Sequence, residues 1–288
     1  MNDRPSSVAV AKARDIISRW LITEPMEIDL ENIASDLNLL IVERRITGAV
    51  ARLVCRTQLG VIAVSDSIPE VGRKRFAVAH EIGHFILHKA KSPLAICTDE
   101  DFHDWYEHSA DEMEANTFAA ELLMPAELFR ERCTSKEPSL AEVKRLAEDF
   151  QTSLSATAIR YVSLGKNPCA LIASKDGKVG WRSIHKSFPY RIVRRGTQLH
   201  EYSCANDFFE TGKVPEKAES VSGVAWLEDL EVAKNCFVYE EVIPLKSYNV
   251  VLSLIWVQQD YNKPKESNYE RPKYDPDKFT PDGKRYRW

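Results

Sequence analysis

Two histidines and a glutamate stand at a spacing that could bind and activate a metal ion. His80, Glu81 and His84 form the pattern H-E-x-x-H. On a helix, residues four apart share one face, with Cβ atoms about 5–6 Å apart. Two imidazoles placed in this way could bind one Zn²⁺ at about 2.0–2.1 Å. Glu81 could then reach a water on the metal, accept its proton and deliver that proton to a leaving amine. The pattern predicts peptide-bond hydrolysis, with Zn²⁺ as the cofactor and Mn²⁺ as its alternative in the cell.

His88 lies on the same predicted helix face but is not expected to be the third ligand. Residues eight apart are separated by about 12 Å along a helix, which is too far for His80 and His88 to share one small ion. Leu87 and Ala90 also occupy the positions of the glycine and final histidine in the longer three-histidine motif. We interpret His88 as a packing residue or as a support for the ligands.

The third ligand is expected from the acidic segment 111–125. Glu112 stands one turn before Ala115 and Asn116, and small residues such as Ala115 would let the two helices approach closely. Glu112 could then face the metal while Asn116 orients a histidine, at the spacing of the Glu-x-x-x-Asp motif of glutamate-type zinc peptidases. Glu114 is the competing candidate, and Asp111 is a weaker one. The two of these three residues that do not bind the metal would be solvated acidic groups at a helix start, where the helix dipole favours negative charge.

The elements that must position these residues can be predicted from hydrophobic spacing. We expect the H-E-x-x-H helix to cover about 73–89, before Pro93, and the next helix to cover 112–123, before Pro125. An acidic and aromatic loop, 99–111, connects them. Upstream we expect helices over 6–21 and after Asp29, then strands at 40–42, 51–54 and 61–64. The last strand could pair with an extended substrate as an added strand.

Residues 139–165 are predicted to form two helices joined by a polar turn. Their charges are balanced, with basic residues matched by acidic ones: Lys144, Arg145 and Arg160 against Glu142, Glu148 and Asp149. A helix that reads DNA normally carries a basic face. We therefore expect packing against the peptidase core, and direct nucleic-acid binding is not expected.

The pattern becomes mostly strand-like after Pro168. Strands at 170–173 and 179–184 flank Asp176-Gly177, a hairpin signal, and two further strands are expected at 237–243 and 250–257. The fold class is α+β. The predicted domains are a metallopeptidase domain at 1–135, a helical segment at 136–166, a mixed α/β domain at 167–258 and a disordered, proline-rich tail at 259–288.

The totals indicate an ordinary globular protein. The chain has 288 residues, 44% hydrophobic and 28% charged, with a net charge of −4, so no general attraction to nucleic acid or anionic lipid is expected. No apolar run approaches the roughly 20 residues that span a bilayer, and no signal peptide is recognised. The six cysteines are widely spaced and are interpreted as free thiols. We expect a cytoplasmic protein without a membrane partner.

Residues 75–88 and 112–125 closely resemble the two long motifs of the ImmA/IrrE family of bacterial and phage metallopeptidases. This resemblance extends from about 8 to 165 and implies a small zincin-like domain. It implies His80 and His84 as zinc ligands, Glu81 as catalytic base and Glu112 as the third ligand. It further implies a helix-turn-helix-like segment after the core, a helix-turn-helix repressor as substrate, and a role in stress response or mobile-element regulation. The resemblance also implies a GAF-like sensor domain after this segment, in the place that residues 168–257 could fill.

The first hypothesis is therefore a regulatory zinc endopeptidase. The intact Glu81 favours it over a non-cleaving sensory or DNA-binding regulator on a peptidase fold. A third hypothesis is a toxin–antitoxin or phage-defence accessory that works by protein contact. The group that stabilises the oxyanion of the reaction is left unassigned among Tyr161, His185, Tyr190 and His200.

Overall fold

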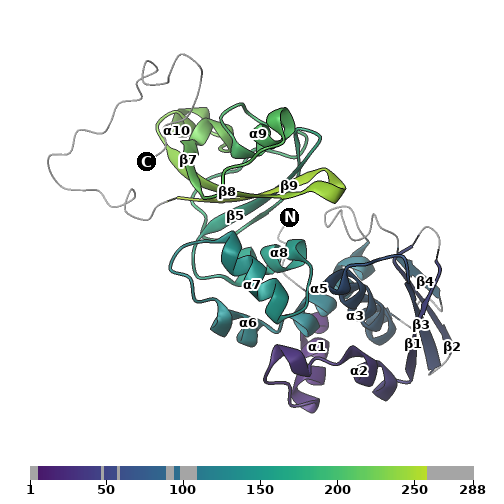
Figure 1. The fold of residues 1–288 in the computed structure, drawn as a ribbon. Helices are drawn as coiled ribbons and strands as arrows, with labels where there is room; N and C mark the ends of the chain where they lie inside the picture. The colour runs from purple at the N-terminus through teal and green to yellow at the C-terminus, as the bar shows by residue number, and fades with distance from the viewer. Residues whose placement is uncertain (1–5, 47–48, 57–58, 89–93, 98–108, 258–288) are drawn as a thin grey trace. The chain divides into compact units, whose positions relative to one another are not determined.

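The computed structural model describes residues 6–46, 49–56, 59–88, 94–97 and 109–257, with only the backbone for 94–97. The chain divides into two units (Figure 1). Unit 1 comprises Met1–Thr134 and Val143–Arg160, and unit 2 comprises Ser135–Glu142 and Tyr161–Trp288. Each unit is described by itself below.

Unit 1 begins with helices whose starts are capped by side-chain oxygens. Ser6 accepts a hydrogen bond from the amide of Ala9, and Asp29 accepts one from Asn32, which satisfies amides left without partners at a helix start. The elements in chain order are α1 (Ser7–Arg19), η1 (Pro25–Glu27), α2 (Leu30–Asp36), β1 (Leu39–Arg44), β2 (Ala51–Arg56), β3 (Leu59–Ser65), α3 (Val71–His88), β4 (Leu94–Cys97), α5 (Ala110–Leu123) and α6 (Ala126–Arg132). The predicted strands and the H-E-x-x-H helix are confirmed.

The sheet of unit 1 has the strand order β1-β3-β2-β4. β3 pairs in parallel with β1 on one side and antiparallel with β2 on the other. Both of its hydrogen-bonding edges are therefore occupied by neighbours. The prediction that Val61–Val64 receives an extended substrate as an added strand is wrong, because β3 is an interior strand and an added strand requires a free edge.

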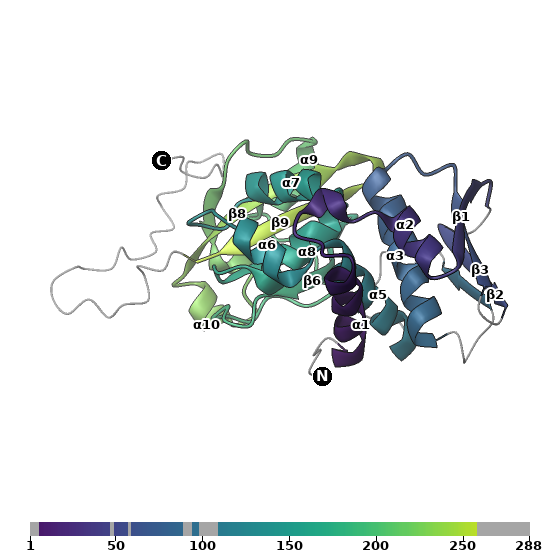
Figure 2. The same ribbon diagram turned by 90° about the horizontal axis from the view of Figure 1, so that it is seen from below.

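Helix α3 lies at the centre of unit 1. It contacts β2 and β3 and packs most extensively against α5, while α1 covers α5 (Figure 2). Every residue of α3 from Phe76 to Phe85 is buried. A helix that is buried on all sides is held from several directions at once, so it is a rigid platform for side chains that must keep a fixed geometry.

The helix pair, α7 (Leu140–Asp149) and α8 (Leu154–Leu164), is tied to the core of unit 1 through Arg160. The guanidinium of Arg160 bonds the carboxylate of Glu121 on α5, and its Nε donates to the carbonyl of Met124 at 3.0 Å. Arg14 on α1 donates to the same Glu121 carboxylate at 2.9 Å. Arg160 is consequently a largely buried anchor and does not contribute to an exposed basic face.

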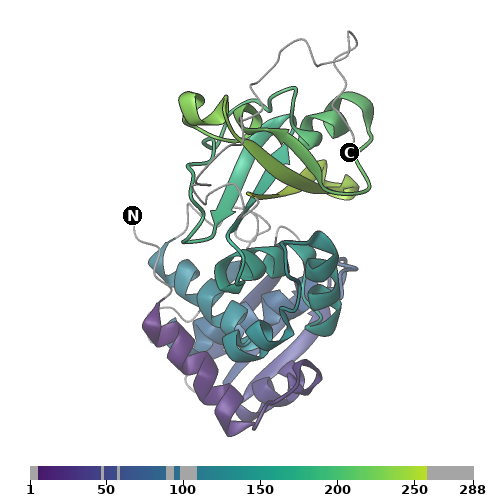
Figure 3. The same cartoon turned by 90° about the vertical axis from the view of Figure 1, so that its left-hand side faces the viewer.

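Unit 2 contains a five-stranded sheet with the order β6-β5-β9-β8-β7, antiparallel throughout (Figure 3). Asp176 and Gly177 join β5 to β6 with φ values of 51° and 74°, as the hairpin prediction requires. The elements are β5 (Cys169–Lys175), β6 (Lys178–Ile184), α9 (Cys204–Thr211), β7 (Glu219–Ser222), η2 (Gly223–Ala225), α10 (Leu230–Ala233), β8 (Phe237–Leu245), η3 (Lys246–Tyr248) and β9 (Val250–Trp256).

Glu240 is a fully buried carboxylate at the centre of unit 2. It accepts hydrogen bonds from the amides of Cys204 and Ala205, from the indole of Trp226 and from the hydroxyl of Ser253, at 2.8–3.0 Å. Burial raises the pKa of Glu240, and the four donors oppose this effect. The carboxylate therefore joins β8, β9 and the start of α9.

Several sequence predictions need correction or fall outside the described residues. α5 begins at Ala110, after the Ser109 cap, so its start precedes the predicted residue 112 and the loop predicted for 99–111 ends earlier. The rest of that loop, 99–108, and the predicted disordered tail, 259–288, lie outside the described residues. The cysteines described with side chains are free thiols: Cys55, Cys133, Cys169, Cys204 and Cys236. In the described part of the chain, no helix has the length and apolar composition needed to cross a membrane.

Candidate metal centre

The site depends on a close approach of α3 to α5. A Cβ atom added at Gly83 would lie 3.0 Å from Cδ1 of Phe118 and 3.2 Å from Cα of Ala115, closer than ordinary van der Waals contact. Glycine at 83 and alanine at 115 therefore allow the two helices to approach, as the small residue at 115 predicts. This approach brings the first turn of α5 to the histidine face of α3.

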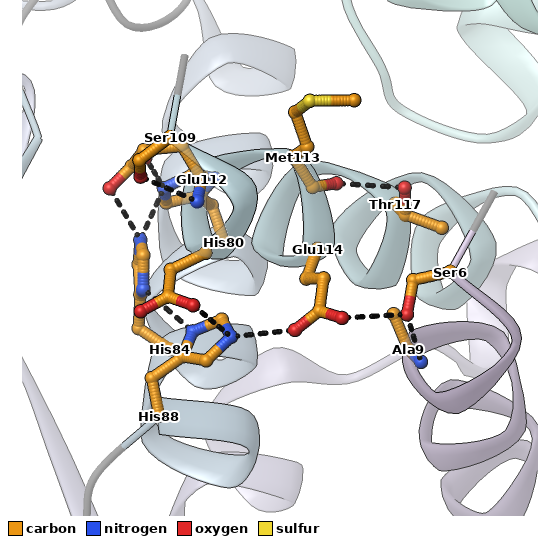
Figure 4. A network of polar contacts seen from close by, with 11 residues as sticks. Ser6, Ala9, His80, His84, His88, Ser109, Glu112, Met113, Glu114 and Thr117 are labelled. Carbon is orange, nitrogen blue, oxygen red and sulfur yellow. Dashed lines mark hydrogen bonds and ion pairs between the residues drawn. The ribbon is translucent and has the colours of Figure 1, made fainter. Parts of the chain in front are cut away.

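Three side chains converge where the helices meet. The Nε2 atoms of His80 and His84 are 3.0 Å apart. Glu112 places Oε2 3.1 Å from His80 Nε2 and Oε1 3.1 Å from His84 Nε2 (Figure 4). Ligands held at about 2.0–2.1 Å by a tetrahedral Zn²⁺ are about 3.3 Å from one another, so the spacing and the chemistry of this donor set fit one divalent metal ion.

Asn116 controls the orientation of His80. Its Oδ1 lies 2.8 Å from His80 Nδ1, and both side chains are buried. An amide oxygen only accepts hydrogen bonds, so His80 carries its proton on Nδ1 and directs a lone pair from Nε2 toward Glu112 and His84. The prediction that Asn116 orients a histidine is confirmed.

The charges in the cluster act on one another strongly. Burial lowers the pKa of His80 below its ordinary value, although Glu112 opposes the effect. Burial also lowers the pKa of His84, but the bond to Glu112 and the charges of Glu112 and Glu81 outweigh it, so the pKa of His84 is raised. Burial would raise the pKa of Glu112, yet the two imidazoles hold it well below its usual range. Glu112 is thus ionised, as a metal ligand must be.

Glu81 follows His80 on α3, and its side chain is fully buried. Its negative charge raises the pKa of His84, so the carboxylate acts electrostatically on the cluster from within the same helix. An ionisable group with no exposure beside a candidate metal centre is a candidate for proton transfer.

The two rival acidic residues, Glu114 and Asp111, lie against His88. Glu114 Oε2 lies 2.9 Å from His88 Nε2, and Asp111 Oδ1 lies 3.6 Å from the same nitrogen. His88 is itself buried, with Nδ1 3.2 Å from His84 Nδ1. The structure therefore brings Glu112 to His80 and His84, and it places Glu114 and Asp111 in a second group around His88.

The four candidates for oxyanion stabilisation remain unassigned. Tyr161, His185, Tyr190 and His200 belong to unit 2, whereas the cluster belongs to unit 1. Burial raises the pKa of Tyr161, whose hydroxyl bonds the Glu142 side chain.

The chain is similar to known proteins in two respects, a family of sequences and a solved fold. Residues 34–161 match the model of peptidase family M78, described as the IrrE N-terminal-like domain. A solved structure described as a Mycobacterium tuberculosis transcriptional regulator is similar, with a TM-score of 0.54 and 13% identity, over 88% of this chain and 76% of that chain. At that identity the likeness shows the fold alone. No curated protein sequence matches the chain.

Proposed function

Residues 34–161 are an IrrE N-terminal-like domain of the ImmA/IrrE family, and on this premise we propose that the protein is a zinc-dependent endopeptidase. It hydrolyses a peptide bond within a protein substrate. The observation that carries the proposal is the convergence of His80 Nε2, His84 Nε2 and the Glu112 carboxylate, with separations of 3.0–3.1 Å. Two imidazoles and one carboxylate form a donor set typical of catalytic zinc sites that keep one position open.

Each residue of the site has a distinct role in the proposed reaction. His80, His84 and Glu112 hold the metal, with Zn²⁺ preferred and Mn²⁺ as the alternative. When bound by these residues, the metal would supply Lewis-acid chemistry, with a lowered pKa for a water molecule and a polarised carbonyl group of the substrate. Glu81 accepts the proton of the attacking water on a carboxylate oxygen and then donates it to the nitrogen of the leaving amine. Asn116 keeps the His80 ring in the tautomer that leaves Nε2 available.

The proposed substrate is a helix-turn-helix transcriptional repressor, cut in a stress response or during mobile-element regulation. The family resemblance supports this substrate class. The ion pair that holds the largely buried Arg160 against Glu121 supports a structural role for α7 and α8, so the protein would act on a DNA-binding partner without binding DNA itself. Unit 2 would be the sensory part, in the place of the family's GAF-like domain, and unit 1 would be the zincin-like catalytic part.

A cleavage assay with one substitution tests the proposal. Wild type and Glu81→Gln would be loaded with zinc and incubated with the repressor encoded beside the gene. Glu131, which is exposed on α6, provides the matched control Glu131→Gln. We expect wild type and Glu131→Gln to cut the repressor, and Glu81→Gln to retain zinc but lose cleavage.

The outcomes separate the proposed enzyme from its alternatives. A fully active Glu81→Gln variant would exclude Glu81 as the base. A wild-type protein that binds zinc and the repressor without cutting it would support a non-cleaving regulator or an accessory of a toxin–antitoxin or phage-defence system.

A further inference from the structure

A chain of hydrogen-bonding groups extends outward from His84 through α3, α5 and the start of α1. His84 Nδ1 lies 3.2 Å from His88 Nδ1, and His88 Nε2 lies 2.9 Å from Glu114 Oε2. The hydroxyl of Ser6, which caps α1, donates to Glu114 Oε1 at 2.9 Å. Figure 4 shows this path from the metal cluster to α1.

The chemistry of the groups fixes where each proton lies once His84 binds a metal. A histidine that ligates through Nε2 carries its proton on Nδ1, so His84 donates from Nδ1 to His88 Nδ1. His88 must accept at Nδ1 and therefore carries its own proton on Nε2. That proton is donated to Glu114, which is a carboxylate acceptor.

His88 and Glu114, together with the nearby Asp111, offer an alternative interpretation as a second metal site. One ligand atom from each of His88, Asp111 and Glu114 lies within 4.8 Å of the others. A metal there would need the Nε2 lone pair of His88, and His88 Nδ1 would then carry the proton and donate to His84 Nδ1. His84 would in turn hold its proton on Nε2 and could not ligate the first metal. As long as both imidazoles are neutral, a metal bound by His88 Nε2 therefore excludes a metal bound by His84 Nε2, and the reverse also holds.

We propose that His88 and Glu114 are positioning residues that fix His84 Nε2 as a metal donor, and that the His88, Asp111 and Glu114 group binds no metal when the first site is filled. This inference rests on the proposed metal centre. It gives Glu114 and Asp111 different roles, since Glu114 accepts the His88 proton at 2.9 Å while Asp111 is 3.6 Å away. Removing a hydrogen-bond partner of a ligating histidine typically changes metal affinity 10- to 100-fold, and Glu114 acts on the ligand His84 through its partner His88.

The test compares zinc binding in three variants of the full chain. Glu114→Met removes the acceptor, Glu114→Gln keeps an acceptor oxygen without the charge, and Asp111→Asn is the matched control in the same group. Zinc affinity is measured by competition with a chromophoric chelator, and stoichiometry is measured by elemental analysis. We expect one zinc per chain in every protein, with affinity about 10-fold weaker or more in Glu114→Met, intermediate in Glu114→Gln and within about twofold of wild type in Asp111→Asn.

Nitrogen NMR of histidine-labelled, zinc-loaded wild type gives a readout that loss of stability does not imitate. We expect His88 as the Nε2–H tautomer and His84 as the Nδ1–H tautomer. Two zinc ions per wild-type chain, with one lost in Asp111→Asn, would overturn the inference in favour of a second metal. One zinc per chain with unchanged affinity in Glu114→Met would overturn it while leaving the proposed function intact. A protein that shows the expected affinities but cuts no substrate would refute the proposed function alone, and a wild type that binds no zinc would refute both.

Discussion

Replacing Asn116 with leucine should weaken zinc binding about 10- to 100-fold, because the substitution removes the acceptor that holds His80. Leucine has the branching of asparagine, although it is bulkier, and it offers no hydrogen-bonding atom. His80 has 0% exposure and Asn116 has 4%, so water cannot readily replace the lost oxygen at His80 Nδ1. The ring would be free to rotate or to move its proton to Nε2, where the metal should bind.

Two independent arguments give a similar size for this effect. A buried donor left without an acceptor costs about 1–3 kcal/mol. A 10- to 100-fold loss of affinity corresponds to about 1.4–2.7 kcal/mol. The matched control is Asn116→Asp, which keeps an oxygen at the position 2.8 Å from His80 Nδ1 and should bind zinc at least as tightly as wild type.

The assay titrates metal-free protein with zinc in competition with a chromophoric chelator, and circular dichroism establishes that each variant is folded. A folded Asn116→Leu variant with wild-type affinity would refute the reasoning, since His80 would then need no partner. An Asn116→Asp variant as weak as Asn116→Leu would also refute it, because the acceptor oxygen would not be the feature that matters.

Two further substitutions test buried charges away from the metal. Among the described residues, Arg160→Met leaves Glu121 with Arg14 as its remaining ion-pair partner, so unit 1 should lose about 3 kcal/mol of stability. The helical circular dichroism signal should then be lost at a lower urea concentration. Glu240→Gln places an amide NH₂ group among four hydrogen-bond donors and should destabilise unit 2 by about 2 kcal/mol. Tryptophan fluorescence during urea unfolding measures this loss. Zinc stoichiometry should not change in either variant, and wild-type unfolding midpoints would contradict the assigned roles.

The local part of the metal centre could be predicted because it depends on helix periodicity. His80 and His84 share a face at a spacing of four, and Glu112 and Asn116 repeat that spacing on the next helix. The cluster geometry follows from placing these two faces together, which the small residues at the contact indicated. Arrangements of this kind are encoded within a few turns of helix, so short sequence segments predict them well.

Arrangements that join distant parts of the chain could not be predicted in this way. The strand at Val61–Val64 was recognised, yet its place between β1 and β2 depends on a parallel pairing that skips β2 in sequence. The bond from Ser6 to Glu114 joins residues 108 positions apart. Neither feature leaves a local pattern, because pairing and docking are decided by the packing of the whole unit.

Helix α9 is not among the elements predicted from the sequence, although local signals for it are present. Helix α9 follows Ser203, which caps it, and ends at Gly212 in the left-handed conformation. A polar cap followed by a glycine terminator is a recognised helix signature, but α9 is only eight residues long. Short helices of this kind are stabilised mainly by tertiary contacts, here through Glu240 at the amides of Cys204 and Ala205.

Helix α1 precedes the family segment 34–161, yet it belongs to the same folded body. Ser6 bonds Glu114 beside the metal cluster, and Arg14 bonds the buried Glu121. The stretch that matches the family model is therefore shorter than the folded unit to which it belongs. A truncation to residue 34 would remove the helix that packs against α5 and one cationic partner of Glu121. Recombinant versions of unit 1 should therefore retain α1.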